Sequence, residues 1–202
     1  IKNMVSGLSL VARNAERHAD NPAFRADMVE TLKDSAARMN ALLARLSQHH
    51  RSLPEPLQPV DVAVLAARLA GARRAQHVIE VAGQGTALAQ PGRLEQLLGH
   101  LLQNAVEASP TDAPITIGIA TEGARVEIDV VDQGCGMSAA FIRDQLFRAF
   151  ASSKPDGFGL GAYEARELAS AMGGTLTVTS REGAGTRFRV TLPAATALEA
   201  AA

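Results

Sequence analysis

Three prolines within nine residues are the feature that most limits how this chain of 202 residues can fold. They stand in the segment "SLPEPLQPV", residues 52–60. Proline has no amide hydrogen to donate and disfavours helical backbone in the residue before it, so a helix or a central strand does not continue through such a segment. The apolar pattern also changes here, from purely helical spacing to a mixture of helices and strands. We therefore predict a linker at residues 52–60 between an N-terminal domain, residues 1–51, and a second domain, residues 61–193.

The N-terminal domain is predicted as a helical hairpin. Its second helix carries an apolar seam at steps of four and three residues, and a shorter apolar stripe precedes it. The seam consists of Phe24, Met28, Leu32, Ser35, Met39, Leu42 and Leu46, and the stripe of Ile1, Val5, Leu8, Ala12 and Ala15. Asn21 before Pro22 is typical of a helix that starts anew after a break. Two helices cannot bury such a seam alone, so we expect a homodimer with a four-helix bundle; packing on the second domain is the alternative.

The second domain mixes helices with alternating strands. We predict helices at residues 61–73, 91–109 and 162–174, the last closed by Gly173-Gly174, and a short helical start after residue 138. Strands are predicted at residues 77–83, 115–119, 126–130, 175–180 and 186–193, with a turn at Glu122-Gly123. The strands are expected to pair largely as antiparallel hairpins, with the helices covering one face. This is an α+β fold, an α/β sandwich, followed by an Ala-rich frayed tail at residues 194–202.

Composition excludes several classes of function. The net charge is −1, Trp is absent and Tyr163 is the only tyrosine, so neither a basic footprint nor base-stacking aromatics favour nucleic acid. Cys135 is the only cysteine, which excludes an intramolecular disulfide and a multi-thiolate zinc site and fits a reducing compartment. Its thiol is either reactive or a small filler of a tight loop. No apolar run approaches a membrane span and no signal peptide is visible, while Ile1 opens within a helical pattern, as expected for a fragment of a longer protein.

Four features of the second domain carry chemistry. Asn104 lies on the predicted leucine-rich helix with His100 one turn earlier on the same face; taken alone, His100 is better explained as a core histidine. A strand ends in Asp132-Gln-Gly134-Cys-Gly136, which raises the question of why two glycines follow at once. The glycines of "GFGLG", residues 157–161, precede a helix and are typical of a phosphate-binding nest, although neither a Walker A lysine nor a preceding strand accompanies them. The fourth feature is "GAGTRFRVTLP", residues 183–193.

Taken in order, these motifs resemble the conserved boxes of sensor histidine kinases, in the gyrase/Hsp90/kinase/MutL ATPase superfamily. The matching segments are Asn104, Asp132-x-Gly-x-Gly136, Leu146-Phe-x-x-Phe150, Gly157-x-Gly-Leu-Gly161 and Gly185-Thr-x-Phe188. The resemblance covers residues 61–193 and implies the Bergerat type of ATP-binding fold. The front hairpin resembles the dimerisation and histidine-phosphotransfer hairpin. Its opening "IKNMVSGLSL" resembles the end of a phosphoacceptor box, as in kinases associated with exosortase systems, and this match puts the phosphorylated histidine two residues upstream of Ile1.

The resemblance implies ATP and Mg²⁺ as cofactors and assigns residues to them. Asp132 would accept the adenine amino group, a choice that disfavours guanine, and Asn104 would be a Mg²⁺ ligand. The further nucleotide-binding positions are Glu107, Ala108, Gly134, Gly136, Met137, Lys154, Gly157, Gly159, Leu160, Gly161 and Thr186. Phe147 and Phe150 are expected to anchor a lid over the triphosphate.

Several of these positions leave alternatives open. Lys154 is either a γ-phosphate contact or a solvated loop lysine, and Thr186 either a contact near the base or a strand-edge threonine. His100 replaces an Asn common in related kinases and would act as a base or orient phosphate. Glu107 stands where Lys or Arg is frequent, which puts a phosphate contact there in doubt. Asn3 is either a surface amide or the group that orients water for dephosphorylating a response regulator.

The function implied is the cytoplasmic kinase core of a two-component sensor. ATP bound to the second domain would phosphorylate a histidine of the hairpin, and the phosphoryl group would pass to an aspartate of a response regulator receiver domain. The linker would act as a hinge, and the full-length protein would be anchored in the bacterial inner membrane through segments absent from this chain. The alternatives are an anti-sigma-type serine kinase, an ATPase clamp, and a non-catalytic nucleotide-sensing adaptor.

Overall fold

The computed structural model divides the chain into two compact units, Ile1–Pro54 and Glu55–Ala202. It describes residues 9–10, 12–15, 21–22, 24–33, 55–73, 77–151 and 159–195. The boundary between the units falls within the segment predicted as a linker. Among the described residues, no helix combines the length and the apolar character needed to cross a membrane.

The described part of the first unit is helical apart from Asn21. The side-chain Oδ1 of Asn21 accepts a hydrogen bond from the amide of Phe24 at 3.4 Å, and its carbonyl accepts one from Arg25 at 3.0 Å. This is the capping role of a residue placed before a helix start. Phe24 and Met28 of the predicted seam are half-buried, whereas Leu32 is 43% exposed. The seam from Ser35 onwards lies outside the described residues, so the hairpin and its dimer stay predictions.

The second unit is built on a five-stranded sheet of order β2-β4-β5-β7-β6. The strands are β2 (Ile79–Gly83), β4 (Ile115–Glu122), β5 (Arg125–Asp132), β6 (Thr175–Ser180) and β7 (Thr186–Pro193). β4 with β5, β5 with β7, and β6 with β7 pair antiparallel, but β2 lies parallel to β4. The expectation of antiparallel hairpins is therefore wrong for this edge, because the chain passes through a helix between β2 and β4 and re-enters the sheet in the same direction.

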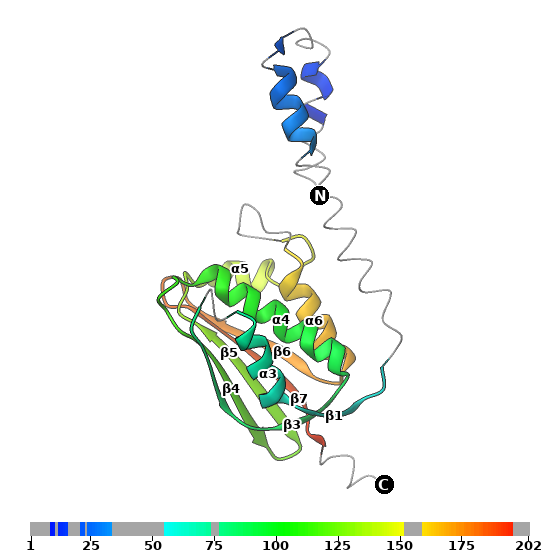
Figure 1. Ribbon diagram of the computed structural model, residues 1–202, viewed down its shortest axis with the longest axis vertical. Coiled ribbons are helices and arrows are strands. Elements are labelled where there is room, and N and C mark those ends of the chain that lie inside the picture. Colours follow the sequence, from blue (N-terminus) through cyan, green and yellow to red (C-terminus); the bar gives the residue numbers. More distant parts are fainter. Residues whose placement is uncertain are drawn as a thin grey trace. The chain divides into compact units, whose positions relative to one another are not determined.

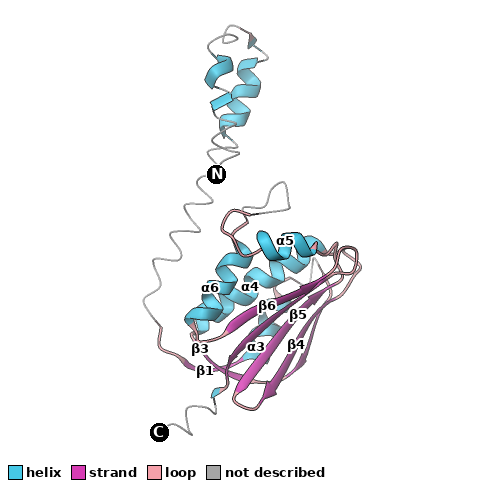
Figure 2. Cartoon of the chain, turned by 180° about the vertical axis from the view of Figure 1, so that it is seen from behind, coloured by secondary structure: helices cyan, strands magenta, loops and turns pink. Residues whose placement is uncertain are grey.

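Three helices cover one face of this sheet, as Figures 1 and 2 show from opposite sides. They are α3 (Val62–Gly71), α4 (Pro91–Ala108) and α6 (Gly161–Ala171). The apolar stripe of α4 packs inward with no exposed surface on Leu94, Leu97, Leu98, Leu101 and Leu102. The predicted α+β sandwich is confirmed, and its core forms where this stripe meets the inward residues of the strands.

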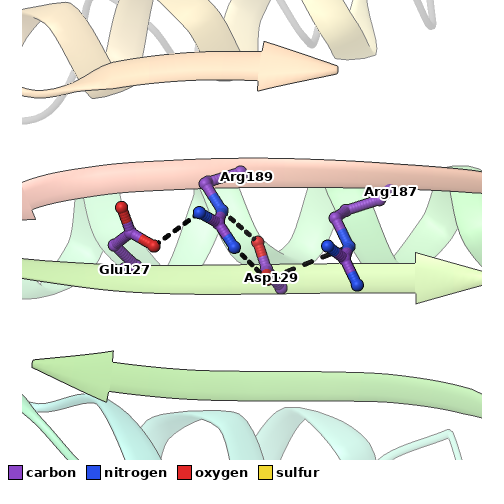
Figure 3. Close-up of polar contacts among 4 residues, drawn as sticks. All are labelled: Glu127, Asp129, Arg187 and Arg189. Atoms are coloured by element: carbon purple, nitrogen blue, oxygen red, sulfur yellow. Dashed lines mark hydrogen bonds and ion pairs between the residues drawn. The ribbon is translucent and has the colours of Figure 1, made fainter. Parts of the chain in front are cut away.

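The opposite face of the sheet carries charge, because successive strand residues point to opposite sides. Figure 3 shows Arg189 of β7 between Glu127 and Asp129 of β5. Its guanidinium donates two hydrogen bonds of 2.8 Å to Asp129, and Nη1 lies 2.7 Å from Glu127 Oε2. The guanidinium of Arg187 also lies 3.9 Å from Asp129. The hydrogen bonds from Arg189 hold the pKa of the Asp129 carboxyl below its usual value. These pairs tie β5 to β7, which are far apart in the sequence.

Two predicted boundaries need correction. Residues 58–60 of the expected linker belong to β1 (Gln58–Asp61), which pairs antiparallel with an unpredicted strand, β3 (Thr86–Ala89). Residue 194 of the expected frayed tail is buried, bridges to Ala87 and donates its amide to the carbonyl of Ala124 at 2.9 Å. Both segments are short or rich in alanine, so they lack the β-branched alternation that announces a strand.

Candidate functional site

Asp132 is the last residue of β5, and its side chain is held within the protein. The residue is only 5% exposed. Its Oδ1 accepts hydrogen bonds from the amide of Gly134 at 2.9 Å and from the amide of Thr186 at 3.2 Å. A buried carboxylate is costly unless donors compensate it. The two amides therefore fix the carboxylate in one orientation at the end of the strand.

The chain's own backbone explains why two glycines follow Asp132, because it leaves no room for a side chain at either position. A Cβ on Gly134 would collide with the carbonyl of Ala108, at the end of α4. Gly136 has φ +66°, and a Cβ there would collide with the carbonyl of Arg181. The two glycines expected among the nucleotide-binding positions therefore also let the loop pack against protein backbone. The side chain of Cys135 is exposed, so the view of it as the filler of this loop is wrong.

The turn between β6 and β7 closes over the same loop. Gly183 donates its amide to the carbonyl of Cys135 at 2.7 Å. The hydroxyl of Ser180 accepts a hydrogen bond from the amide of Met137 and lies 2.9 Å from Thr186 Oγ1. Thr186, the first residue of β7, is buried. Sequence reasoning missed Ser180, because a serine at a strand end carries no signal of what it will meet.

Asn104 lies half-buried on α4, facing the first turn of α6. A Cβ on Gly161 would come 3.5 Å from Asn104 Oδ1, which is ordinary van der Waals contact. Leu160, before the helix, is buried. Glu107 is exposed and accepts a hydrogen bond of 2.9 Å from the side chain of Gln103. Since Ala108 is one turn beyond Asn104, α4 links the start of α6 to the Asp132 loop.

His100 meets an acid that the sequence analysis did not single out. Its Nε2 lies 3.0 Å from Oε2 of Glu164 on α6. The side chain of His100 is 24% exposed, and Glu164 is buried. The two atoms are within hydrogen-bonding distance, but Nε2 forms no hydrogen bond in the structure.

The segment after α5 (Ala139–Asp144) leads to the predicted lid. Phe147 is half-buried beneath the guanidinium of Arg166, which lies 4.8 Å from the ring centre. Phe150 is 43% exposed with φ +67°, so the expectation that it anchors the lid in a pocket is wrong. Its amide donates to the carbonyl of Gly159 at 3.0 Å, which brings residues 150 and 159 together. Lys154 and Gly157 lie outside the described residues, as does Asn3.

Comparison with known proteins then decides the family. The profile described as "Histidine kinase-, DNA gyrase B-, and HSP90-like ATPase" matches residues 89–196, more than half of the chain. The chain belongs to this family. The matched segment contains Asn104, the Asp132 loop, the start of α6 and the hairpin of β6 and β7.

Two of the similar proteins are a sensor histidine kinase and a sensor protein. The sensor histidine kinase ZraS of Escherichia coli (strain K12) is 28% identical over 96% of this chain and 43% of its own length. The C4-dicarboxylate transport sensor protein DctB of Rhizobium meliloti (strain 1021) is 31% identical over 95% of this chain and 32% of its own. The chain thus spans less than half the length of these curated relatives.

Solved structures show the same fold. Full-length ShkA in complex with AMPPNP aligns over 86% of this chain and 39% of its own, with a TM-score of 0.65 and 26% identity. The mycobacterial sensor histidine kinase MprB aligns over 68% of this chain and 97% of its own, with a TM-score of 0.62 and 24% identity. The predicted resemblance to a histidine kinase ATP-binding core is confirmed.

Proposed function

We propose that the second unit binds Mg-ATP and that the chain is the kinase core of a two-component sensor, which phosphorylates a histidine and then a response regulator aspartate. The observation that carries the proposal is the buried carboxylate of Asp132, oriented by the amides of Gly134 and Thr186. A carboxylate has several lone pairs, so it can accept a further donor such as the amino group of adenine. The carbonyl that guanine presents in its place would be repelled. The sensor-kinase relatives support this reading.

The base would lie beside the Asp132 loop. The loop is held by Ala108 on one side and by the turn between β6 and β7 on the other. We assign Ala108, Gly134, Gly136, Met137 and Thr186 to this end of the nucleotide. In this assignment the two glycines let the loop pack tightly against its neighbours, and the tight packing aims the carboxylate.

The phosphates would lie towards the start of α6. Its first amides and its helix dipole attract anions, and Gly159, Leu160 and Gly161 bring the backbone to this end. Lys154 and Gly157 are proposed to join them from the lid. Glu107 carries the wrong charge for a phosphate contact and already accepts from Gln103, so we assign it none.

Asn104 suits Mg²⁺ better than it suits a metal held by protein alone. The described residues contain no cluster of three or more His, Cys, Asp or Glu side chains that would hold an ion. Mg²⁺ is commonly bound through one or two protein oxygens with phosphates and water completing its shell, and the half-buried amide of Asn104 offers such an oxygen. When bound, the ion neutralises phosphate charge. Asn104 would hold it beside the start of α6.

The transfer itself would need the N-terminal unit. We propose that it forms a homodimer through its helical hairpin, that the acceptor histidine lies just upstream of Ile1, and that Asn3 orients water for dephosphorylation. The segment around the prolines would be the hinge. The full-length protein would be held in the bacterial inner membrane with this core in the cytoplasm, without a role for nucleic acid.

Radiolabelled ATP, carrying the label on its γ-phosphate, tests the proposal. We expect acid-labile, base-stable label on a version extended upstream by one or two helical turns and none on the present chain, with the signal abolished by Asp132→Asn. Tight nucleotide binding without label on either version would instead support a non-catalytic adaptor. Acid-stable label on an added protein substrate would support a serine kinase. Absence of nucleotide binding by the present chain would refute the proposed site.

A further inference from the structure

An acid and a histidine face each other between α4 and α6. Figures 1 and 2 show these two helices side by side over the sheet, and His100 of α4 approaches Glu164 of α6 with Nε2 and Oε2 3.0 Å apart. The neighbouring buried positions of both helices are apolar, as Leu97, Leu101 and Leu168 illustrate. A polar pair therefore lies among the apolar side chains that fill this helix interface behind Asn104.

Stability alone does not explain this pair. Glu164 is 5% exposed, and taking a carboxylate out of water commonly costs more than the attraction within an ion pair returns. Apolar side chains of similar volume would serve a helix interface at least as well. Glu164 also lies in the first turn of α6, where an acid favours the helix dipole, but this effect does not require burial.

The place of the pair relates it to the proposed magnesium ligand. Gly161 lies against Asn104, and Glu164 follows Gly161 by three residues while His100 precedes Asn104 by four. The helices therefore run antiparallel, and the pair lies one turn behind the contact between Asn104 and the start of α6. The ring of His100 lies on the same face of α4 as Asn104. Any rearrangement of the pair between His100 and Glu164 therefore moves a ring that is next to the proposed magnesium ligand on this face.

The partner atom determines the form of the imidazole. An ionised carboxylate only accepts hydrogen bonds, so a neutral ring in this position carries its hydrogen on Nε2, the nitrogen next to the carboxylate. Nε2 and Oε2 are 3.0 Å apart, which is within hydrogen-bonding distance for this N–H once it is aligned with Oε2. Nδ1 of the neutral ring is then a hydrogen-bond acceptor.

We propose that Glu164 is a positioning residue that acts through His100. It fixes the ring in the form with hydrogen on Nε2, so that Nδ1 acts as a neutral acceptor for a water of the metal–phosphate end of the site. The inference rests on the proposed function, in which Asn104 holds a hydrated ion. Of the two roles open to His100, it favours that of a base, in which the neutral ring accepts a hydrogen bond from water, over that of orienting phosphate.

Ring-nitrogen NMR of the present chain without nucleotide tests the first step. The ¹⁵N signals of His100, assigned by their loss in His100→Asn, are expected to show the form protonated on Nε2. Glu164→Leu is expected to shift them to a mixture of forms, and Glu164→Gln, which keeps an acceptor, to preserve them. Glu167→Gln is the matched control, since Glu167 is on the same helix but exposed. A ring protonated on Nδ1 in the unaltered chain would overturn the proposal.

Kinetics of the full-length protein test the second step. Glu164→Leu is expected to lower the maximal autophosphorylation rate about tenfold, the lower end of the effect of residues that orient ligands. The KM for ATP should stay within about twofold, and Glu164→Gln should recover most of the rate. In a His100→Asn background, Glu164→Leu should cause no further loss. An equal loss in both backgrounds would show a purely structural role and overturn the proposal.

The two experiments separate this inference from the function on which it rests. If the unaltered chain binds no ATP, the proposed function fails, whatever the ring signals show. If it binds ATP and is phosphorylated, but Glu164→Leu changes neither the ring signals nor the rate, the proposed function stands and the role of Glu164 is refuted. Melting temperatures of the variants identify any that fail to fold, and Glu164→Gln, which is almost isosteric, keeps the comparison usable in that case.

Discussion

Replacing Asp132 by Asn or by Ala separates its part in the fold from its part in binding. In the structure its Oδ1 satisfies two buried amides, those of Gly134 and Thr186. Asn keeps an oxygen for both donors but puts an amino group where the second carboxylate oxygen stood. Ala removes the acceptor altogether. The two variants should therefore differ in stability, and both should lose nucleotide affinity.

The magnitudes follow from these contacts. A buried donor left without a partner costs about 1–3 kcal/mol, so Asp132→Ala should lower the free energy of unfolding by about 2–6 kcal/mol. Asp132→Asn weakens two hydrogen bonds without removing them and should cost about 1 kcal/mol. For ATP, losing one hydrogen bond to a charged group is worth about 1.5–3 kcal/mol, which weakens binding between about tenfold and about 150-fold.

Urea unfolding followed by circular dichroism measures the first quantity, and titration with a fluorescent ATP analogue measures the second. Asp112→Asn is the matched control, since Asp112 is exposed in a loop. Equal stability of the Ala and Asn variants would refute the role of the carboxylate in satisfying the two amides. Unchanged ATP affinity in Asp132→Asn would refute its role at adenine.

Three further predictions concern the scaffold. Hydrogen bonds from Arg189 lower the pKa of Asp129 in the folded protein, so the unfolded chain binds the proton more readily. The pair between Arg189 and Asp129 therefore stabilises the fold at pH values above the ordinary carboxyl pKa. This stabilisation is lost as the pH falls through the lowered pKa of Asp129 in the folded protein. Asp129→Asn should therefore lower the free energy of unfolding by about 1 kcal/mol at pH 7, allowing for screening at the partly exposed Arg189. The stability difference between this variant and the unaltered chain should close as the pH falls below about 4. Unfolding experiments that show a constant difference down to pH 3, or an equal effect of Asp144→Asn at the exposed pair with Arg143, would contradict this role of Asp129. Gly136→Ala should destabilise the fold by more than the ~1–2 kcal/mol cost of left-handed backbone, because its Cβ also meets the carbonyl of Arg181. Gly123→Ala, with φ +56° and open space around it, should show only the cost of left-handed backbone. Equal decreases in melting temperature for the two variants would argue against the close contact. Glu55→Ala should destabilise the second unit by about 1 kcal/mol, since Glu55 Oε2 accepts a hydrogen bond from the amide of Gly92 at 3.0 Å and so caps α4. Glu55→Gln keeps an acceptor and should retain most of the stability. Equal stability of the two variants in urea unfolding would exclude the capping role of Glu55.

Much of the site was visible in the sequence as separate pieces. The leucine spacing of α4 put Asn104 and His100 on one face, and the strand pattern that ends at Asp132 singled this residue out. The reason for the glycines after it was not visible, since it lies in the carbonyls of Ala108 and Arg181, which belong to other elements. Ser180 and Glu164 were missed for the same reason: a single serine or glutamate has no pattern until its partner is known.

The sequence by itself determined the local structure and the family. The helical and alternating periods of apolar residues depend on neighbours within a few residues, so α4, α6 and the hairpin of β6 and β7 could be predicted from the sequence. The order of the motifs along the chain likewise indicated the family. Only the tertiary structure decided that β2 runs parallel to β4, that Ala194 is buried, and that His100 meets Glu164. These contacts join residues that are far apart in the chain. Which residues meet depends on how whole helices and strands pack together, and the local sequence around either residue does not determine that packing.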